Sequence, residues 1–396
     1  MVTWRVTTVL LVAATYAIGC GEIIGANWNV TVKAASPEAG LVLHLPDASK
    51  KEADAPHDAH GDAASFPFTA IAGNPGGQTL NAIFGWDESD FVAVGTGEIA
   101  YVYSGGLLQS TGGTTAGYDL YGVWGASPTD VYAVGVVASN NTGFIQHFDG
   151  TEWTTVFESP TALFGVWGDL TPNGPGVLAV GDQGVIYGLP PDEMGGWQTV
   201  LSVPESPGAP DAGPFSPVLT SITGGNGSIT VTAEGDQFFQ WLPGASGDYY
   251  YEPQGDPRTN FAASWQPALA TGATDVYLGS NFFGFYWITS TYVGPLDGST
   301  ATTVGPDGGA TLYQLYGDQV PGGEELAILG IWGTASKVVA VGDLGKVLLF
   351  DVLSGNLSVL PSGTQQSFGG VWGSDLEHVW IVGANELILQ GSLAGL

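Results

Sequence analysis

The sequence is short of positive charge and of cysteine. Its 396 residues include 7 Lys and Arg against 38 Asp and Glu, which gives a formal net charge of −31. A protein that neutralises nucleic-acid phosphates needs a patch of Lys and Arg. The composition therefore excludes nucleic-acid binding and argues against unaided adsorption to anionic lipid. The single cysteine, Cys20, excludes an intramolecular disulfide.

Charge of either sign is also scarce, at 11% of the residues. Exposed helix faces are usually rich in Glu, Lys and Arg, so this scarcity argues against a helical protein. Hydrophobic residues make up 44% of the chain and aromatic residues 11%, whereas disordered chains lack such apolar content. Together with 62 Gly and 24 Pro, these values predict a large all-β protein with many glycine-rich turns.

The N-terminus has the features of an exported protein. Residues 6–18 are largely apolar, follow Arg5 and stop just before Cys20, and they are too short to span a bilayer comfortably. The segment resembles a bacterial lipoprotein signal, in which the cysteine is acylated and becomes the new N-terminus. The resemblance implies a signal peptide at 1–19 and a lipidated, palmitate-bearing Cys20.

The residues after the cysteine complete this expectation. Residues 20–64 are rich in Ala, Asp and Pro, and we expect them to form a flexible tether. Gly21, rather than Asp, follows the cysteine, which by the same resemblance implies sorting to the bacterial outer membrane. The periplasmic and cell-surface sides both stay open, and the lipid anchor is the only expected membrane contact.

Beyond residue 64 the sequence repeats in units of roughly 40 residues. Each unit has a corner that is usually an aromatic residue followed by Gly, and then an apolar strand that ends in Gly. Four short strands at this spacing are typical of a β-propeller blade. Residues 65–396 are therefore predicted to form seven blades, each a four-stranded antiparallel sheet. The corners lie at Phe84-Gly85, Trp124-Gly125, Trp167-Gly168, Thr223-Gly224, Trp265-Gln266, Trp332-Gly333 and Trp372-Gly373.

The second strand of each unit predicts how the blades pack. Residues 91–95 and 131–135 are apolar at consecutive positions, whereas a sheet with one wet face would alternate. Each blade must therefore be covered on both faces, with the corner tryptophans filling the wedges between sheets. The last unit leaves room for three strands, so we predict that residues 66–71 supply its outer strand and close the ring.

Several strings carry a family resemblance. Residues 180–187 and 341–348 contain the Asp-x-Gly hairpin, and residues 123–153 contain the full repeat. They resemble Asp-box (BNR-like, sialidase-type) propellers, secreted bacterial propeller-repeat proteins and the photosystem II stability factor group. The resemblance implies the fold and says little about activity. Sialidases of this type clamp the substrate with three arginines, and Arg258 is the single arginine beyond residue 64, so sialidase activity is excluded.

Other chemistry has few candidate residues. The propeller histidines are His147 and His378, and neither stands in a pattern that suggests a nucleophilic triad. No catalytic residue is predicted, although paired carboxylates for glycoside hydrolysis stay open. Asp182 and Asp343 lie at hairpin tips, as turn acceptors or as weak Ca²⁺ ligands. We expect no cofactor apart from Ca²⁺ at these tips.

Uneven spacing of the units points to one face of the propeller. Additions at 201–218, 253–261 and 296–327 are each expected between the last strand of one blade and the first strand of the next. Such connections emerge on one face, and long loops in compact folds are often functional. Aromatic runs nearby either pack the blades or bind a ligand. The candidate ligand-binding residues are Tyr249, Tyr250, Tyr251, Arg258, Phe283 and Tyr286.

These features favour a non-enzymatic binding or scaffold lipoprotein of the bacterial cell envelope. It is expected to be a monomer that recognises a protein or a glycan through the face with the three additions. The first alternative is a carbohydrate-active propeller enzyme, a glycoside hydrolase or lyase that uses paired carboxylates. The second is a structural component of an envelope assembly without a soluble ligand.

Overall fold

The computed structural model divides the chain into two units, residues 1–44 and 45–396. All the residues that the structure describes belong to the second unit. The predicted signal peptide, Cys20 and the tether lie outside them. Among the described residues, no helix is long and apolar enough to cross a membrane. The described ranges are 67–113, 117–171, 174–191, 195–202, 217–225, 228–234, 237–241, 248–251, 261–265, 274–280, 284–290, 311–316 and 327–396.

The described strands pair into seven four-stranded antiparallel sheets. Three sheets come from the N-terminal half: β2 (Leu80–Asp87), β3 (Asp90–Gly95), β4 (Ala100–Ser104) and β5 (Leu107–Ser110); β6 (Tyr118–Ser127), β7 (Asp130–Val137), β8 (Thr142–Phe148) and β9 (Trp153–Ser159); and β10 (Leu163–Asp169), β11 (Gly176–Gly181), β12 (Val185–Leu189) and β13 (Gln198–Ser202).

Two further sheets follow: β14 (Leu219–Gly225), β15 (Ser228–Ala233), β16 (Gln237–Trp241) and β17 (Asp248–Tyr251); and β18 (Phe261–Trp265), β19 (Thr274–Ser280), β20 (Gly284–Ser290) and β21 (Thr311–Tyr316). The sixth sheet contains β22 (Ile328–Gly333), β23 (Lys337–Gly342), β24 (Val347–Asp351) and β25 (Asn356–Leu360). The seventh joins β26 (Phe368–Gly373), β27 (Val379–Gly383) and β28 (Leu387–Gly391) to β1 (Phe68–Ala72).

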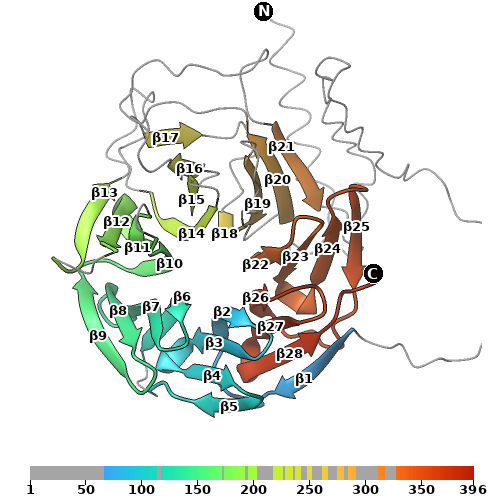
Figure 1. Ribbon diagram of the computed structural model, residues 1–396, viewed down its shortest axis with the longest axis horizontal. Coiled ribbons are helices and arrows are strands. Elements are labelled where there is room, and N and C mark those ends of the chain that lie inside the picture. Colours follow the sequence, from blue (N-terminus) through green and yellow to red (C-terminus); the bar gives the residue numbers. More distant parts are fainter. Residues whose placement is uncertain are drawn as a thin grey trace, which may run out of the picture. The chain divides into compact units, whose positions relative to one another are not determined.

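Within this unit the sheets follow one another in chain order, as Figure 1 shows, with the first strand of each sheet innermost and the fourth at the outer edge. The first strands of neighbouring sheets contact one another in the pairs β2–β6, β6–β10, β10–β14, β14–β18, β18–β22, β22–β26 and β26–β2. The prediction of an all-β fold made of four-stranded antiparallel sheets is confirmed.

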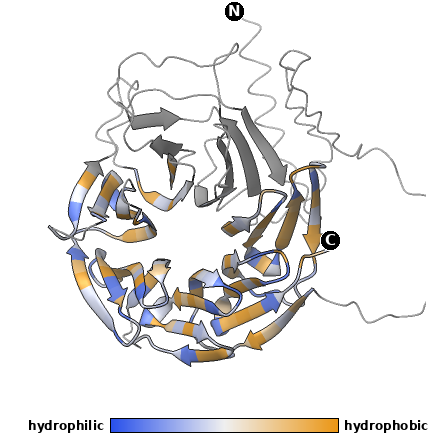
Figure 2. Ribbon diagram, viewed as in Figure 1, coloured by the Kyte–Doolittle hydropathy of each residue, from blue (hydrophilic) through white to orange (hydrophobic). Residues whose placement is uncertain are grey.

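The second strands form the core, as their composition predicts. All of Phe91, Val92, Ala93 and Val94 on β3 are fully buried, although successive side chains of a strand point to opposite faces. Both faces of the sheet are therefore covered by neighbouring sheets. Figure 2 shows apolar residues recurring along the strands of the coloured sheets.

The aromatic-Gly corners are contacts between sheets. A Cβ atom at Gly168 of β10 would lie 2.7 Å from Cη2 of Trp124 on β6, so the indole occupies the space above the glycine. Gly373 lies in the same way under Trp332 of the preceding sheet. The prediction that the corner tryptophans fill the wedges between sheets is confirmed for these pairs. It also explains why Gly follows Trp in the sequence.

The seventh sheet takes its outer strand from the other end of the chain. β1 pairs antiparallel with β28, with Phe68 opposite Gly391. Phe68 is 5% exposed and belongs to the core cluster that contains Phe368, Leu389 and Leu393. The residues predicted to complete this sheet, 66–71, thus overlap the strand that does so.

One predicted connection is wrong. Residues 296–327 were expected to join one sheet to the next without a strand, but β21 lies within this range and pairs with β20. Residues 291–310 therefore connect the third and fourth strands of one sheet, and only the residues after Tyr316 connect that sheet to the next. The segment Thr311–Tyr316 has neither Gly nor Trp, which is why the repeat pattern did not reveal it.

Candidate binding face

Strand order assigns every connection to one of two faces. Because neighbouring strands are antiparallel, the connections between second and third strands emerge on the same face as those from a fourth strand to the next sheet. We call this the turn face. The connections between first and second strands and between third and fourth strands emerge on the opposite face. The strand ends joined by the predicted additions 201–218 and 253–261 lie at the turn face, whereas the ends of β20 and β21 that residues 291–310 join lie at the opposite face.

Four tight 3₁₀ turns lie on the turn face: η1 (Thr96–Glu98), η2 (Asp182–Gly184), η3 (Asp343–Gly345) and η4 (Ala384–Glu386). The last two residues of each turn have positive φ, a conformation that suits glycine. Gly184 and Gly345 meet this requirement in η2 and η3. The corresponding residues of η1 and η4 are Glu98 and Glu386, at φ 61° and 55°, a conformation that costs energy for a residue with a side chain.

The side chain of Glu386 makes hydrogen bonds that join the seventh sheet to the first and offset this cost. Its carboxylate accepts hydrogen bonds from the Tyr101 hydroxyl at 2.6 Å, from Asn74 Nδ2 at 3.1 Å and from the Gln78 backbone N–H at 3.2 Å. Burial raises the pKa of Glu386, but these three hydrogen bonds outweigh it and hold the pKa below its ordinary value. Burial and the bond to Glu386 raise the pKa of Tyr101 to about 12.

Glu98 repeats this arrangement one sheet further on. Its carboxylate accepts a hydrogen bond from Nε2 of Gln146 on β8, and Gln146 is buried. The Gly97 backbone N–H of the same turn donates to Asp119 Oδ1 of β6 at 2.9 Å. Both turns therefore hold the next sheet through a carboxylate, which makes this part of the turn face a fixed surface.

The predicted Ca²⁺ candidates lie in the remaining two turns. Asp182 begins η2, and its carboxylate accepts the Gln183 backbone N–H at 2.8 Å. Asp343 begins η3 and accepts the Lys346 backbone N–H through its carbonyl oxygen at 3.1 Å. Asp182 thus acts as a turn acceptor through its side chain, whereas the hydrogen bond to Asp343 uses its main chain. In the part of the chain that the structure describes, no group of three or more His, Cys, Asp or Glu is placed to hold a metal ion.

A β-bulge recurs near the turn-face end of every first strand. In β2, for example, Leu80 pairs with Gly95 and Ala82 with Val94, so Asn81 is left without a register partner. A bulge redirects one residue while its strand continues. The bulged positions are Asn81, Tyr121, Phe164, Thr220, Ala262, Leu329 and Gly369. We call this set the bulge ring.

Two members of the bulge ring, Tyr121 and Phe164, form an accessible aromatic pair, which we call the aromatic step. The rings of Tyr121 and Phe164 meet edge to face with their centroids 5.6 Å apart, although they come from different sheets. Tyr121 is 38% exposed and Phe164 is half-buried. Burial, and secondarily the charge of Asp119, raise the pKa of Tyr121, so its hydroxyl is neutral at physiological pH.

The bulge ring was not predicted from the sequence, although the sequence contains a pattern that marks it. A large residue and a small residue flank each bulge position, as with Leu120 and Gly122 around Tyr121, and the large residue is buried wherever its burial is described. The small residue is required because the next inner strand lies close: a Cβ atom at Gly122 would be 2.9 Å from the Phe164 carbonyl oxygen. In each unit, the residue between this large residue and this small residue is therefore the bulge position.

The predicted aromatic candidates are only partly placed. Tyr249, Tyr250 and Tyr251 lie on β17, the fourth strand of its sheet, and Tyr286 lies on β20, the third strand of the next sheet. The two groups are therefore in neighbouring sheets but on different strand positions. Arg258 and Phe283 lie outside the described residues, as do most of the long turn-face connections.

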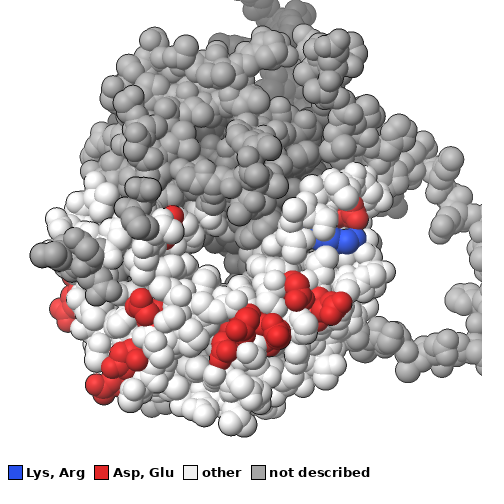
Figure 3. Space-filling model, in the orientation of Figure 1, with Lys and Arg blue, Asp and Glu red and all other residues white. Residues whose placement is uncertain are grey.

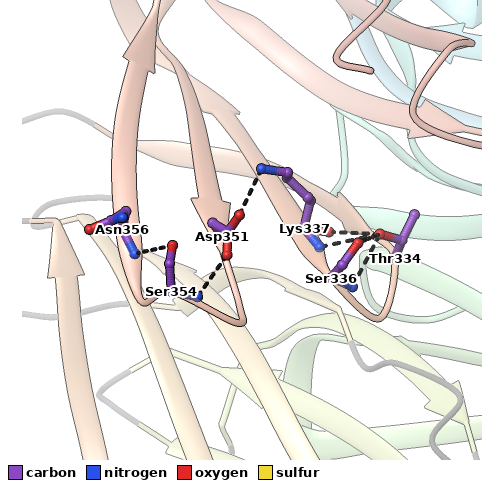
Figure 4. Close-up of polar contacts among 6 residues, drawn as sticks. All are labelled: Thr334, Ser336, Lys337, Asp351, Ser354 and Asn356. Carbon is purple, nitrogen blue, oxygen red and sulfur yellow. Dashed lines mark hydrogen bonds and ion pairs between the residues drawn. The ribbon is translucent and has the colours of Figure 1, made fainter. Parts of the chain in front are cut away.

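The opposite face carries ion pairs at strand ends. Lys337 Nζ lies 2.8 Å from Asp351 Oδ2, and Asp351 also accepts the Ser354 backbone N–H at 2.8 Å (Figure 4). The hydrogen bond from Lys337 is the main cause that holds the pKa of Asp351 below its ordinary value. His147 Nε2 lies 2.9 Å from Asp130 Oδ1. These contacts fix neighbouring strands and turns to one another.

Carboxylates carry most of the charge on the described surface. Figure 3 shows several separate groups of Asp and Glu on the face turned to the viewer, and one small group of Lys or Arg. On the turn face the described cation is Lys346. The described carboxylates there include Glu98, Asp119, Glu158, Asp182, Glu234 and Asp343. The bulge ring is uncharged within this acidic surface.

Comparison with solved structures identifies the fold as a β-propeller. The structure of YCF48 from Cyanidioschyzon merolae matches with a TM-score of 0.59 and 13% sequence identity, over 83% of this chain and all (100%) of that one. YCF48 bound to D1 peptide matches with a TM-score of 0.55 and 12% identity, over 82% and 97% of the two chains. The WD40 propeller domain of Doa1 matches with a TM-score of 0.53 and 10% identity, over 83% and 97%.

At these identities the likeness shows the fold alone. No family model matches the sequence, and no curated protein matches it. The propeller predicted from the repeats is therefore confirmed, whereas the Asp-box and lipoprotein resemblances stay predictions.

Proposed function

We propose that this chain is a non-enzymatic protein-binding scaffold of the bacterial cell envelope. It is a closed, seven-bladed propeller that recognises its partner through the turn face. A lipid on Cys20 holds it at the outer membrane, residues 20–64 act as the tether, and it works as a monomer.

Close packing of the inner strands supports the closed ring. A Cβ atom at Gly370 of β26 would lie 3.3 Å from the Ala82 Cα of β2, so the last sheet meets the first directly. Glu386 and Tyr101 join the same two sheets. Both contacts are those expected where seven blades close into a ring, because closure removes exposed sheet edges.

The convergence of features on the turn face carries the proposed function. Connections from fourth strands, which include residues 203–218 and 252–260, emerge there together with the bulge ring and the fixed turns. Rigid scaffolds commonly present recognition residues on such loops. The YCF48 structure bound to D1 peptide is a propeller of similar fold with a peptide partner, which supports a protein partner here.

The enzyme alternative receives less support. The described carboxylates with several hydrogen bonds, such as Glu386 and Asp351, hold sheets and turns together and lie on different faces. A glycoside hydrolase needs two carboxyl groups directed at one sugar linkage. The recognition residues predicted at Tyr249, Tyr250, Tyr251, Arg258, Phe283 and Tyr286 remain part of the proposal, as an extension of the turn-face site.

Deletions on the two faces test the proposal. Shortening residues 205–214 and 319–325 on the turn face should abolish capture of the partner from detergent-solubilised envelopes, read by quantitative mass spectrometry. Shortening residues 293–308 on the opposite face is the matched control and should leave capture unchanged. The proposal fails if folded turn-face variants retain the partner, or if the control deletion alone loses it.

A further inference from the structure

The bulge ring differs in chemistry from its surroundings. None of its seven residues is charged, although the chain carries 38 Asp and Glu and the described turn face carries several of them. Asn81 Nδ2 already donates to the Leu120 carbonyl oxygen of the next sheet at 2.7 Å. What the described part of the ring offers a ligand is therefore mainly the apolar surface of Tyr121 and Phe164.

The geometry of the aromatic step suits a flat or branched apolar side chain. The two rings stand at an interplanar angle of 69°, so a third apolar group placed against both would meet one face and one edge. Aromatic groups favour such edge-to-face and offset arrangements. Because the two residues sit on inner strands held by bulges and close-packed glycines, the step is preformed and costs little ordering entropy on binding.

The charges beside the step select among ligands. Asp119 lies on the same strand as Tyr121 and is near enough to raise the pKa of that phenol. Asp119 itself accepts the Gly97 N–H, and Glu98 of the same turn accepts from Gln146. One oxygen of each carboxylate thus already accepts a hydrogen bond from the protein, which leaves fewer acceptor positions for the hydroxyl groups of a sugar. Their negative field still attracts cations.

We propose that Tyr121 and Phe164 receive an aromatic or aliphatic side chain from a peptide segment of the partner, with Lys or Arg on both sides of that residue. This inference rests on the proposed function and specifies its ligand. The apolar residue contacts the step, and the flanking cations face the carboxylates around Asp119 and Glu98. Association is therefore faster and tighter at low salt.

Synthetic peptides test the inference directly. The probes are fluorescein-labelled nonapeptides with a central Phe, Leu or Ser, flanked by two Lys or two Glu on each side, and the readout is fluorescence anisotropy with the full chain. The Phe and Leu peptides with Lys should bind, and the central Ser or the Glu flanks should weaken binding by about tenfold or more. Raising the salt concentration should weaken binding of the Lys-flanked peptides.

Variants of the step provide the second arm. Tyr121→Ala and Phe164→Ala should each weaken binding of the Phe peptide by about tenfold. Tyr121→Phe keeps the aromatic ring and should leave binding unchanged. Leu107→Ala is the matched control, because Leu107 is an apolar residue that is 64% exposed and lies on an outer strand, away from the aromatic step. Circular dichroism and urea unfolding confirm that each variant is folded.

Three results would overturn the inference. They are failure of every Lys-flanked peptide to bind, equal binding of the Ser and Phe peptides, and unchanged binding in both alanine variants. Selective binding of a neutral oligosaccharide in place of the peptides would overturn it as well. If Tyr121→Ala still captures the envelope partner that the turn-face deletions lose, the inference fails while the proposed function stands.

Discussion

Glu386 is a residue whose backbone and side chain make opposing contributions to stability. Its left-handed φ of 55° costs about 1–2 kcal/mol for a non-glycine residue. Hydrogen bonds to a charged group contribute about 1.5–3 kcal/mol each, and this carboxylate accepts three of them. The side chain therefore outweighs the strain, which explains how Glu can replace Gly in this turn.

Replacing Glu386 with Gln should weaken the fold in a pH-dependent way. The folded pKa of Glu386 lies below its ordinary value, so its charge stabilises the fold above the unfolded pKa of about 4.3. This contribution is lost as the pH falls through the folded pKa. We expect Glu386→Gln to lower the free energy of unfolding by about 1–3 kcal/mol at neutral pH. The deficit should shrink toward about pH 3.

Urea unfolding at several pH values measures this difference. Glu152→Gln is the control, because Glu152 is exposed, and it should change stability little at any pH. A deficit of Glu386→Gln that stays constant from neutral to acid pH would show that the carboxylate charge is not what joins the two sheets.

At the scale of strands, the contact between Trp124 and Gly168 is a sharp test of blade packing. Gly168→Ala places a methyl group where Cη2 of Trp124 would be 2.7 Å away, and overpacking of this kind costs about 1–3 kcal/mol. Gly73→Ala is the control, because its Cβ would meet only Leu387 Cδ1 at 3.7 Å. Thermal and urea unfolding should show a loss for Gly168→Ala and none for Gly73→Ala.

A double substitution tests the cause of that loss. Trp124→Phe makes room above Gly168, and Phe84 occupies the corresponding corner of the first sheet. The double variant Trp124→Phe/Gly168→Ala should therefore be more stable than the sum of the two single effects by about 1 kcal/mol. Additive effects would show that the indole does not restrict residue 168.

The strands were predictable where one residue pattern had one physical cause. Consecutive apolar residues such as Val131 to Val134 require cover on both faces, so β7 could be located from sequence. β21 could not, because Thr311–Tyr316 has no Gly or Trp and no long run of consecutive apolar residues. The bulges were also hidden, because a bulge is a feature of the pairing between two strands, and the sequence of one strand contains only the large and small residues that flank it.

At the scale of the whole molecule, repeats determine the fold more readily than they determine the site. Each repeat must bury both faces against its neighbours, so the propeller follows from composition and spacing. The recognition that we propose depends instead on the residues that differ between repeats, such as Tyr121 and Phe164 at positions where other sheets have Asn81 or Gly369. Their proximity depends on the arrangement of different sheets, which no single segment of sequence contains.

The outer strand β1 links the first and last sheets of the propeller, so weakening it should affect the stability of the whole molecule. Phe68 is 5% exposed among residues of the seventh sheet, so Phe68→Ala should lower the free energy of unfolding by about 3–5 kcal/mol. Weakening this strand also uncovers the edge of β28, whose free backbone groups can pair with another chain. We therefore expect Phe68→Ala to self-associate at concentrations where the native chain does not. Urea unfolding and light scattering measure the two effects, with the exposed neighbour Thr69 changed to Ala as the control. If Phe68→Ala matches Thr69→Ala in both measurements, the pairing of β1 with β28 does not stabilise the propeller, and its stability must come from the contacts between inner strands alone.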